Sequence, residues 1–282
     1  MRQKFNLSLP NGQTLSLGSR TLVVGVLNVT PDSFSDGGLY PDPQRALDHA
    51  LELESEGADI IEVGGESTRP ASSRLSADEE LGRVIPVMRV LAGRLRTPVA
   101  IDTYKSVVAG AALDLGAVII NDVSALRFDP GIADLAARAG AGLVLMHMRG
   151  EPSSMHQIEP SKDIFSDIQR DIGEAIDKAK ARGVRPDQVV IDPGIGFGKT
   201  LEQNLEIINQ LDRLVVFELP LMVGTSRKSF IGRLTGRPTE ERLFGTAASV
   251  AVAILRGAHL VRVHDVKEMV EVARITDAIV AA

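Results

Sequence analysis

Gly57-Ala58-Asp59-Ile60-Ile61 is the first of four similar stretches that together decide the fold. Each stretch opens with Gly-Ala, continues as a short apolar run, and follows a segment whose apolar residues recur with the period of a helix. The other three begin at Gly116, Gly140 and Gly257. Glycine is favoured directly after a helix because it accepts a positive φ at little cost. A short apolar run bounded in this way predicts a strand buried on both faces, so the repeated unit is a helix, a glycine stop and a buried strand.

Four further apolar runs complete a set of eight predicted strands, at residues 22–27, 99–101, 189–191 and 221–223. At least one helical segment follows each strand, and residues that favour helix starts stand at the expected places. Asp42-Pro43 and Asp129-Pro130 each place a capping carboxylate before a proline at the first helical position. Three pairs have the spacing of a capping box: Ser76 with Glu79, Thr200 with Gln203, and Asp265 with Glu268.

Eight alternating strand and helix units in a chain of 282 residues predict a (β/α)8 TIM barrel. An open, doubly wound sheet has the same periodicity and is the structural alternative. No linker rich in Pro, Ser and Gly divides the chain, so we expect a single domain over residues 1–282, with the barrel at 22–282. Residues 5–18 alternate apolar and polar positions around Asn11-Gly12, which is typical of a β-hairpin. We expect this hairpin to cover the bottom of the barrel.

The composition restricts the classes of function. Hydrophobic residues make up 44% and charged residues 24%, as in ordinary globular domains. The absence of cysteine excludes disulfides, thiolate metal sites and a cysteine nucleophile. A net charge of −6, with two Tyr and no Trp, disfavours nucleic-acid binding. No apolar run reaches the about 18 residues that span a bilayer, and residues 1–12 lack a signal-peptide core, so we expect a cytoplasmic protein that does not bind membranes.

Polar side chains follow all eight predicted strands, where the active site of a (β/α)8 barrel lies. Acids and amides follow the middle strands, whereas cations follow the seventh and eighth strands, the usual phosphate position of such barrels. Any one of these residues has a second explanation as a helix cap, but together they predict a polar heterocycle bound beside a phosphate group. The residues are Asn28, Glu62, Asp102, Asn121, Asp122, His147, Asp192, Thr225, Ser226, Arg227, Lys228, Arg262 and His264.

Residues 192–200, Asp-Pro-Gly-Ile-Gly-Phe-Gly-Lys-Thr, have the appearance of a phosphate-binding P-loop. The P-loop pattern requires glycine where Pro193 stands, which argues against a nucleotide site. We expect the glycines instead to let the backbone pass close to a ligand. His147 and His156 do not have the spacing of a zinc motif, so no zinc site is expected.

Eight motifs, in order from about Leu22 to the C-terminus, closely resemble those of the dihydropteroate synthase family. They are residues 26–38, 63–70, 101–103, 120–122, 146–148, 192–194, 226–229 and 262–265. The two longest, VLNVTPDSFSDGG and VGGESTRP, are highly specific, whereas Asp-Pro-Gly by itself is a weak signal. One position departs from the family, because Tyr104 stands where many members have serine.

The resemblance implies a folate-pathway transferase that joins p-aminobenzoate to (7,8-dihydropterin-6-yl)methyl diphosphate, with Mg²⁺ on the diphosphate and a homodimeric assembly. It implies Asn28 as the metal ligand and Asp102, Lys228, Arg262 and His264 as catalytic residues. Pterin and diphosphate are expected to bind to Thr68, Arg69, Asp102, Asn121, Met146, Asp192, Phe197, Lys228, Arg262 and His264. p-Aminobenzoate, whose pocket sulfonamide drugs occupy in this family, is expected to bind to Phe34, Thr68, Pro70 and Ser229.

The residue types agree with these roles on chemical grounds. Mg²⁺ prefers oxygen ligands and often keeps waters and phosphate oxygens, so a single Asn oxygen suffices. The edge of a pterin carries N–H donors and a carbonyl, which carboxylates and one lysine complement. Loss of diphosphate leaves a pterin-stabilised cation, and cations at the leaving group with a carboxylate near the carbon stabilise that transition state.

Two other functions fit parts of the sequence. A pterin-dependent methyltransferase of the same superfamily shares the acids and amides but needs no diphosphate cradle, so residues 226–228 and 262–264 argue against it. A catalytically silent paralogue that binds a ligand or a protein partner is the non-enzymatic alternative. Every expected polar position is present, which argues against such decay.

Overall fold

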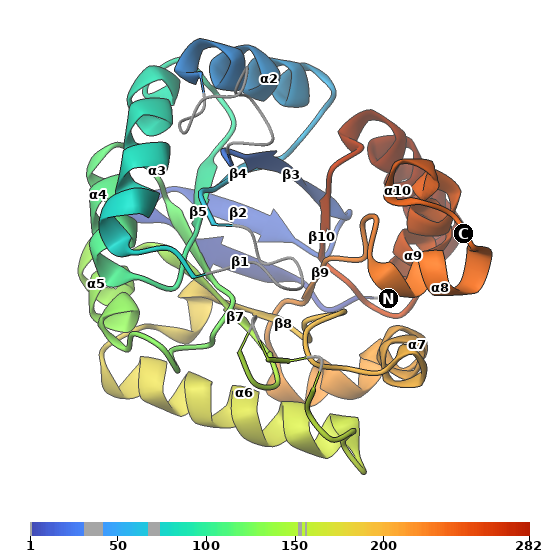
Figure 1. Ribbon diagram of the computed structural model, residues 1–282. Helices are drawn as coiled ribbons and strands as arrows, with labels where there is room; N and C mark the ends of the chain where they lie inside the picture. Colours follow the sequence, from blue (N-terminus) through green and yellow to red (C-terminus); the bar gives the residue numbers. More distant parts are fainter. Residues whose placement is uncertain (1, 31–41, 67–73, 152–153, 156) are drawn as a thin grey trace.

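The computed structural model describes residues 2–30, 42–66, 74–151, 154–155 and 157–282 of the chain. Eight parallel strands form a nearly closed barrel with helices around it (Figure 1). The strands are β3 (Leu22–Asn28), β4 (Ile60–Gly64), β5 (Val99–Asp102), β6 (Ile119–Asp122), β7 (Gly142–Met146), β8 (Val189–Asp192), β9 (Met222–Val223) and β10 (Leu260–Val263).

The strands pair in the order β8-β7-β6-β5-β4-β3-β10-β9. A single parallel bridge between Ile191 and Leu221 joins β8 to the chain just before β9, so the two ends of the sheet meet. The strands are almost continuous apolar runs because one set of side chains faces the barrel interior and the other faces the helices. The prediction of a (β/α)8 barrel is confirmed, and the doubly wound alternative is wrong.

Helices cover the outside of the barrel. The α-helices are α2 (Pro43–Ser55), α3 (Ala77–Leu91), α4 (Ser106–Asp114), α5 (Gly131–Ala139), α6 (Ile164–Ala181), α7 (Leu201–Asn209), α8 (Ser229–Thr235), α9 (Leu243–Leu255) and α10 (Val266–Ala281). Short 3-10 helices lie at η2 (Pro186–Gln188), η3 (Leu211–Phe217) and η4 (Thr239–Glu241). The main core fills the layer between these helices and the strands. None of the described helices is long and apolar enough to cross a membrane.

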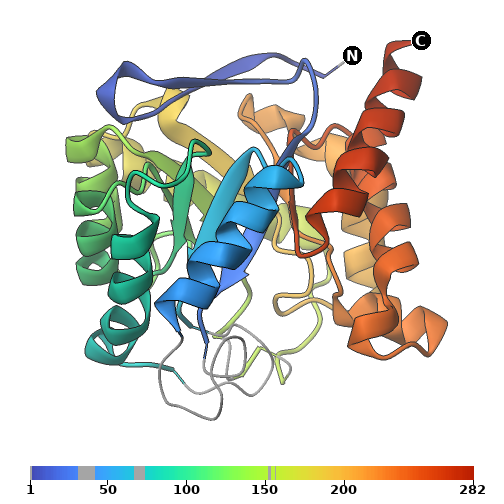
Figure 2. The ribbon, with the colours of Figure 1, turned by 90° about the horizontal axis from the view of Figure 1, so that it is seen from above.

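The N-terminal hairpin closes the bottom of the barrel, as predicted (Figure 2). Its strands β1 (Phe5–Ser8) and β2 (Thr14–Leu17) are antiparallel and joined by η1 (Pro10–Gly12), in which Asn11 has a φ of 59°. Leu7, Leu9 and Leu17 are buried against the inward-facing residues of the strands. This second core cluster separates the bottom of the barrel from solvent, so the open end is the one where the strands finish.

Most of the predicted helix caps are present. Ser76 and Thr200 form complete capping boxes, and the Asp42 side chain accepts from the Gln44 backbone N–H. The prediction for Asp265 is wrong, because its carboxylate does not cap α10 and instead binds Arg227. The sequence predicts Asp129 as the N-cap of α5, but the helix begins one residue later and Pro130 is its N-cap. Its carboxylate accepts from the backbone N–H groups of Ser106 and Gly131 and so joins the starts of α4 and α5.

Candidate functional site

Arg262, on β10, lies between two carboxylates at the open end of the barrel. Its Nη2 is 2.9 Å from Asp102 Oδ2 at the end of β5, and its guanidinium also binds Glu62 on β4. Glu62 is buried, so it needs this cation as a partner. Two carboxylates around one guanidinium leave an excess of negative charge, and burial together with Glu62 raises the pKa of Asp102.

Glu62 also orients Asn121, which lies on β6. Asn121 Nδ2 donates to Glu62 Oε2 at 2.9 Å. The buried Oδ1 of Asn121 has no hydrogen-bond partner among the described residues. Buried polar atoms are normally paired, and with the amide nitrogen engaged, this oxygen is the acceptor that remains for a ligand N–H.

Asp192 supplies a second acceptor at the end of β8. Its side chain is buried, and Oδ1 accepts from the Gly194 backbone N–H at 2.7 Å. Burial raises the pKa of this carboxyl to about 6, against the opposing positive charges of Lys228 and Arg262. Asp192 and Asn121 therefore present acceptors from two different strands.

Lys228 lies beside this acceptor pair. Its Nζ is 4.2 Å from the centroid of the Phe197 ring, a cation–π contact. Burial and the charge of Arg262 lower the pKa of Lys228 to about 8. The preceding residue, Arg227, has a φ of 56°, and its backbone N–H donates to Thr246 Oγ1 at 3.0 Å. These contacts hold the turn that presents Lys228.

His264 is not a cation in this arrangement, which corrects its place among the predicted positive charges. Its Nδ1 lies 2.9 Å from Ser226 Oγ, and its backbone N–H donates to the same oxygen. Burial and the nearby charges of Arg262 and Arg227 lower the pKa of His264 to about 3. At neutral pH the imidazole is therefore uncharged, and its hydrogen-bond contact is with Ser226.

An apolar wall stands beside the polar groups. Met146 and Phe197, both predicted to line the pterin slot, belong to one buried cluster with Tyr104, Val123, Met148 and Met155. Tyr104, the residue that departs from the family pattern, donates its hydroxyl to Glu66 Oε1 at 2.7 Å. The structure thus brings together a buried apolar cluster and several directional hydrogen-bonding groups.

Three polar residues predicted at the rim are used inside the fold. The Asp122 carboxylate accepts from the backbone N–H groups of Ser124 and Leu126 and caps their turn. His147 Nε2 lies 3.3 Å from Asp171 on α6, and burial lowers the pKa of the imidazole to about 4. The guanidinium of Arg227 binds Asp265. The sequence predicts no specific ligand for any of these three residues. Their contacts within the protein account for the polar side chains at these positions.

Two glycines of the P-loop-like stretch approach protein backbone, and the expectation that these glycines let the backbone pass close to a ligand stays a prediction. A Cβ on Gly194 would lie 1.9 Å from the His147 carbonyl oxygen. A Cβ on Gly198 would lie 2.4 Å from the Arg149 carbonyl oxygen. Both have a positive φ, so glycine is required there by conformation and by space. The loop after β8 is packed directly on the loop after β7.

Several predicted site residues fall outside the described residues: Phe34, Thr68, Arg69 and Pro70. Ser229 begins α8 directly after Lys228. Asn28 ends β3 at the same rim as Asp102. A Cβ on Gly64 would lie 3.7 Å from both Asn28 Oδ1 and Asp102 Oδ2, so glycine at this position keeps the space between the two oxygens open.

Glu62 is the residue whose importance the sequence did not reveal. In the sequence it is an acidic residue inside the apolar run of β4, among the polar residues near the strand ends. Its two partners, Arg262 and Asn121, lie far away in the sequence, and no local pattern connects them to it.

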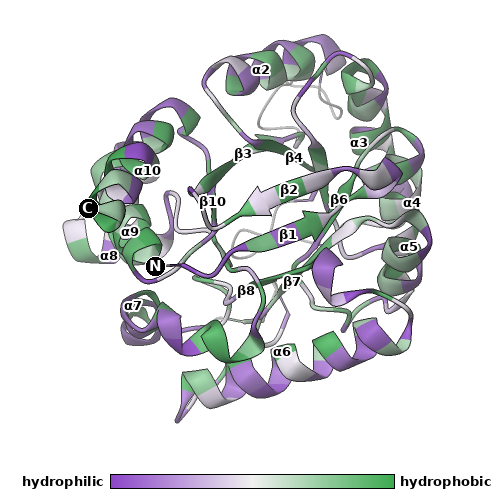
Figure 3. Ribbon diagram, turned by 180° about the vertical axis from the view of Figure 1, so that it is seen from behind, coloured by the Kyte–Doolittle hydropathy of each residue, from purple (hydrophilic) through white to green (hydrophobic). Residues whose placement is uncertain are grey.

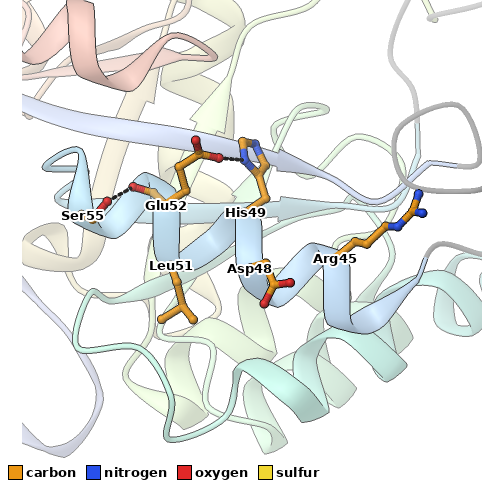
Figure 4. Close-up of a pocket in the computed structure, with 6 residues that line it drawn as sticks. All are labelled: Arg45, Asp48, His49, Leu51, Glu52 and Ser55. Carbon is orange, nitrogen blue, oxygen red and sulfur yellow. Dashed lines mark hydrogen bonds and ion pairs between the residues drawn. The ribbon is translucent and has the colours of Figure 1, made fainter.

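A separate surface depression lies on α2, away from the rim (Figure 4). The described residues that line it all belong to α2, and His49 Nδ1 is 3.0 Å from Glu52 Oε2 there. By contrast, the open end of the barrel brings together charged and amide groups from several strands, so it is the candidate site.

Comparisons with known proteins give the family of this chain. Residues 24–264 match the family described as "Pterin binding enzyme". The dihydropteroate synthase of Synechocystis sp. is 44% identical over 277 residues, which cover 98% of this chain and 96% of the relative. That of Bacillus subtilis is 45% identical over 264 residues, which cover 94% and 90%.

Solved structures show the same likeness in three dimensions. The Yersinia pestis dihydropteroate synthase with a sulfonamide drug complex has a TM-score of 0.91 and 42% identity, covering 98% of this chain and 99% of that one. The Xanthomonas albilineans enzyme with 4-aminobenzoic acid has a TM-score of 0.90 and 41% identity, with coverage of 98% and 99%. This chain therefore belongs to the dihydropteroate synthases, a family of pterin-binding enzymes.

Proposed function

We propose that this dihydropteroate synthase joins p-aminobenzoate to (7,8-dihydropterin-6-yl)methyl diphosphate. The C–O bond to diphosphate breaks, the arylamine nitrogen bonds to the same carbon and loses a proton, and 7,8-dihydropteroate and diphosphate are the products. The observation that carries the proposal is the grouping of Arg262 and Lys228 with the acceptors Asp192 and Asn121 beside an apolar wall. A pterin bearing a diphosphate needs these three kinds of surface together.

The acceptors and the apolar wall account for the pterin. Asp192 and Asn121 Oδ1 accept N–H donors from the pterin edge, and Lys228 donates to its carbonyl. Met146 and Phe197 lie against the faces of the ring, since both belong to the buried apolar cluster. These assignments come from the family pattern and are supported by the positions of the side chains.

The cations account for the leaving group. Arg262 binds the diphosphate together with neutral His264, which supplies a hydrogen bond, and Arg69 is the further family residue, outside the described residues. Asp102, held 2.9 Å from Arg262 Nη2, lies near the carbon that becomes positive. Fixed charges that match the developing charges lower the barrier without reorganising during the reaction.

Mg²⁺ is proposed as the cofactor on the diphosphate, with Asn28 as its protein ligand. The support is that Asn28 Oδ1 and Asp102 Oδ2 each lie 3.7 Å from the point where a Cβ on Gly64 would stand, and oxygen donors are the ligands that a hard cation prefers. When bound, Mg²⁺ neutralises charge on the leaving diphosphate. No group of three or more His, Cys, Asp or Glu among the described residues could hold a metal ion.

A homodimer is proposed through one face of α9. Phe244, Ala248, Val252 and Leu255 are exposed at helical spacing and form a continuous stripe, here called the α9 stripe. Phe244 has 86% of its surface exposed, and α9 is largely hydrophobic along its length (Figure 3). Contiguous exposed apolar surface of this kind marks protein interfaces, and a second copy of the chain presents the same stripe.

The test of the reaction is diphosphate release from the pterin substrate, measured with and without p-aminobenzoate. Release that depends on p-aminobenzoate supports the proposal. A pterin-dependent methyltransferase or a silent paralogue releases no diphosphate under either condition, and that result contradicts the proposal. The cytoplasmic location remains a prediction, which cell fractionation tests.

A further inference from the structure

Lys199, at the end of the P-loop-like stretch, binds three backbone carbonyl groups at once. Its Nζ donates to the oxygens of Gly194 at 2.8 Å, Phe197 at 3.1 Å and His147 at 3.2 Å. A lysine ammonium has three N–H donors, so all of them are used. The side chain therefore has no donor left for a nucleotide phosphate.

The three carbonyls belong to two different loops of the rim. Gly194 and Phe197 lie in the loop after β8, whereas His147 directly follows β7. The two loops are in contact, because Gly194 approaches the His147 carbonyl too closely for any side chain. Lys199 is thus a hydrogen-bonded link across a backbone contact that glycine makes possible, and burial lowers the pKa of its ammonium group to about 7.

The residues next to these carbonyls form the proposed pterin slot. Met146 precedes His147, Asp192 stands two residues before Gly194, and Phe197 supplies both a carbonyl to Lys199 and a ring to Lys228. Any movement of one loop relative to the other changes the distance between the apolar wall and the Asp192 acceptor.

We propose that Lys199 is a positioning residue that sets the width and the orientation of the pterin slot by holding the β7 and β8 loops together. The inference rests on the proposed function, because the slot is assigned to a pterin there. Lys199 also affects the charge of the slot, since its positive charge favours the ionised form of Asp192.

The experiment compares Lys199→Met with Gln188→Met in the full-length protein. Gln188 is a matched control because its Nε2 donates to the carbonyls of Ala136 and Ala141, just before the other end of the same strand, β8. Both substitutions remove hydrogen bonds to backbone carbonyls, but only Lys199 lies at the rim. The measurements are the Kd for free pterin by calorimetry, the KM for each substrate, and the Tm.

Lys199→Met is expected to weaken pterin binding and raise the KM for the pterin diphosphate by about tenfold or more, because charge-assisted hydrogen bonds are lost. The KM for p-aminobenzoate should change by less than about threefold, since that substrate does not enter the slot. Gln188→Met should lower the Tm and leave both KM values and the pterin Kd unchanged.

A lowered Tm for Lys199→Met with an unchanged pterin Kd would show a merely structural lysine and overturn the inference. If Lys199→Met does not fold, Lys199→Arg replaces it. Its planar guanidinium does not match three converging carbonyls, so the same selective loss of pterin affinity is expected, and wild-type affinity would contradict it. The two proposals fail in different measurements. If the proposed function is wrong, the wild-type protein releases no diphosphate, whereas the pterin Kd of the Lys199 variants still tests the role of Lys199.

Discussion

At the scale of single residues, the main feature of the site is that one cation, Arg262, is shared by two carboxylates. Arg262 binds both Glu62 and Asp102, and Lys228 has a lowered pKa, so the carboxylates are not fully neutralised. A group whose charge is only partly compensated responds strongly to pH and to a bound ligand.

Asp102→Asn should reduce turnover by about a hundredfold or more while pterin affinity stays near that of the wild type, because the charge acts mainly on the transition state. Burial and Glu62 raise the pKa of Asp102, so its ionised form is lost as the pH falls from a higher value than for an ordinary carboxyl of about 3.9. As the pH is lowered, the kcat of the wild type should therefore begin to fall at a pH above about 3.9. This decrease in kcat should be absent in Asp102→Asn. Steady-state rates, calorimetry and a melting curve decide; turnover within a few-fold of wild type would contradict the electrostatic role.

Pterin binding should weaken as the pH falls below about 6, the pKa to which burial raises Asp192. Ligand N–H donors favour the carboxylate, so the pKa falls on binding and binding releases a proton below pH 6. The affinity for pterin is therefore at its maximum above about pH 6, and it falls by about tenfold for each pH unit below that value. Calorimetry from pH 4.5 to 8, corrected for the titration of free pterin, measures this limb. A limb that persists in Asp192→Asn would belong to another group.

At the scale of one element, α9 combines two apolar faces. Its inner face packs on the core through Val250, Ala253 and Ile254, and its outer face is the α9 stripe. A helix that is apolar nearly all round is normally covered on both sides. A charge placed on the outer face therefore tests the dimer without touching the core.

Phe244→Glu should convert a dimer into a monomer, because two buried carboxylates would oppose each other across a twofold interface. Sedimentation velocity of the wild type and the variant gives the two masses. Val107→Glu on α4 is the control, since Val107 is also exposed, at 61%, and lies outside the α9 stripe. A monomeric wild type, or a variant that remains dimeric, would rule out this interface.

At the scale of the whole molecule, the two ends of the barrel have different tasks. The bottom is filled by apolar side chains beneath the hairpin, whereas the top carries the charged and amide groups. Stability and chemistry are therefore separated along the barrel axis, as is usual for this fold.

Leu7→Ala should destabilise the protein by about 2 to 5 kcal/mol without changing either KM, because Leu7 is 2% exposed in the bottom cluster and its removal leaves a cavity far from the site. Urea unfolding measures the loss, and kinetics below the transition measure the KM values. A changed KM at full folding would show that the hairpin acts on the rim.

The alternation of strands and helices could be predicted from the sequence because it depends on local patterns. Apolar runs, glycine stops and capping boxes such as Ser76 with Glu79 act within a few residues, so eight units could be counted before any contact was known. The rim could be predicted as well, because all parallel strands of a barrel end on the same side. Predictions for Phe34, Thr68, Arg69 and Pro70 rest on the family motifs alone and remain predictions.

Other properties were decided only by the tertiary structure. Arg262 meets Glu62 and Asp102 across sequence separations of 200 and 160 residues, because the sheet places β10 beside β3 and close to β4 and β5. His264 is neutral because it is buried beside Arg262, and a pKa set by desolvation has no local sequence signal. Lys199 has a nucleotide-binding appearance in sequence, yet three carbonyls from two folded loops occupy its ammonium. Local patterns determined the elements and which ends face the site, whereas distances across the barrel and burial determined which side chains are paired, charged or free to bind.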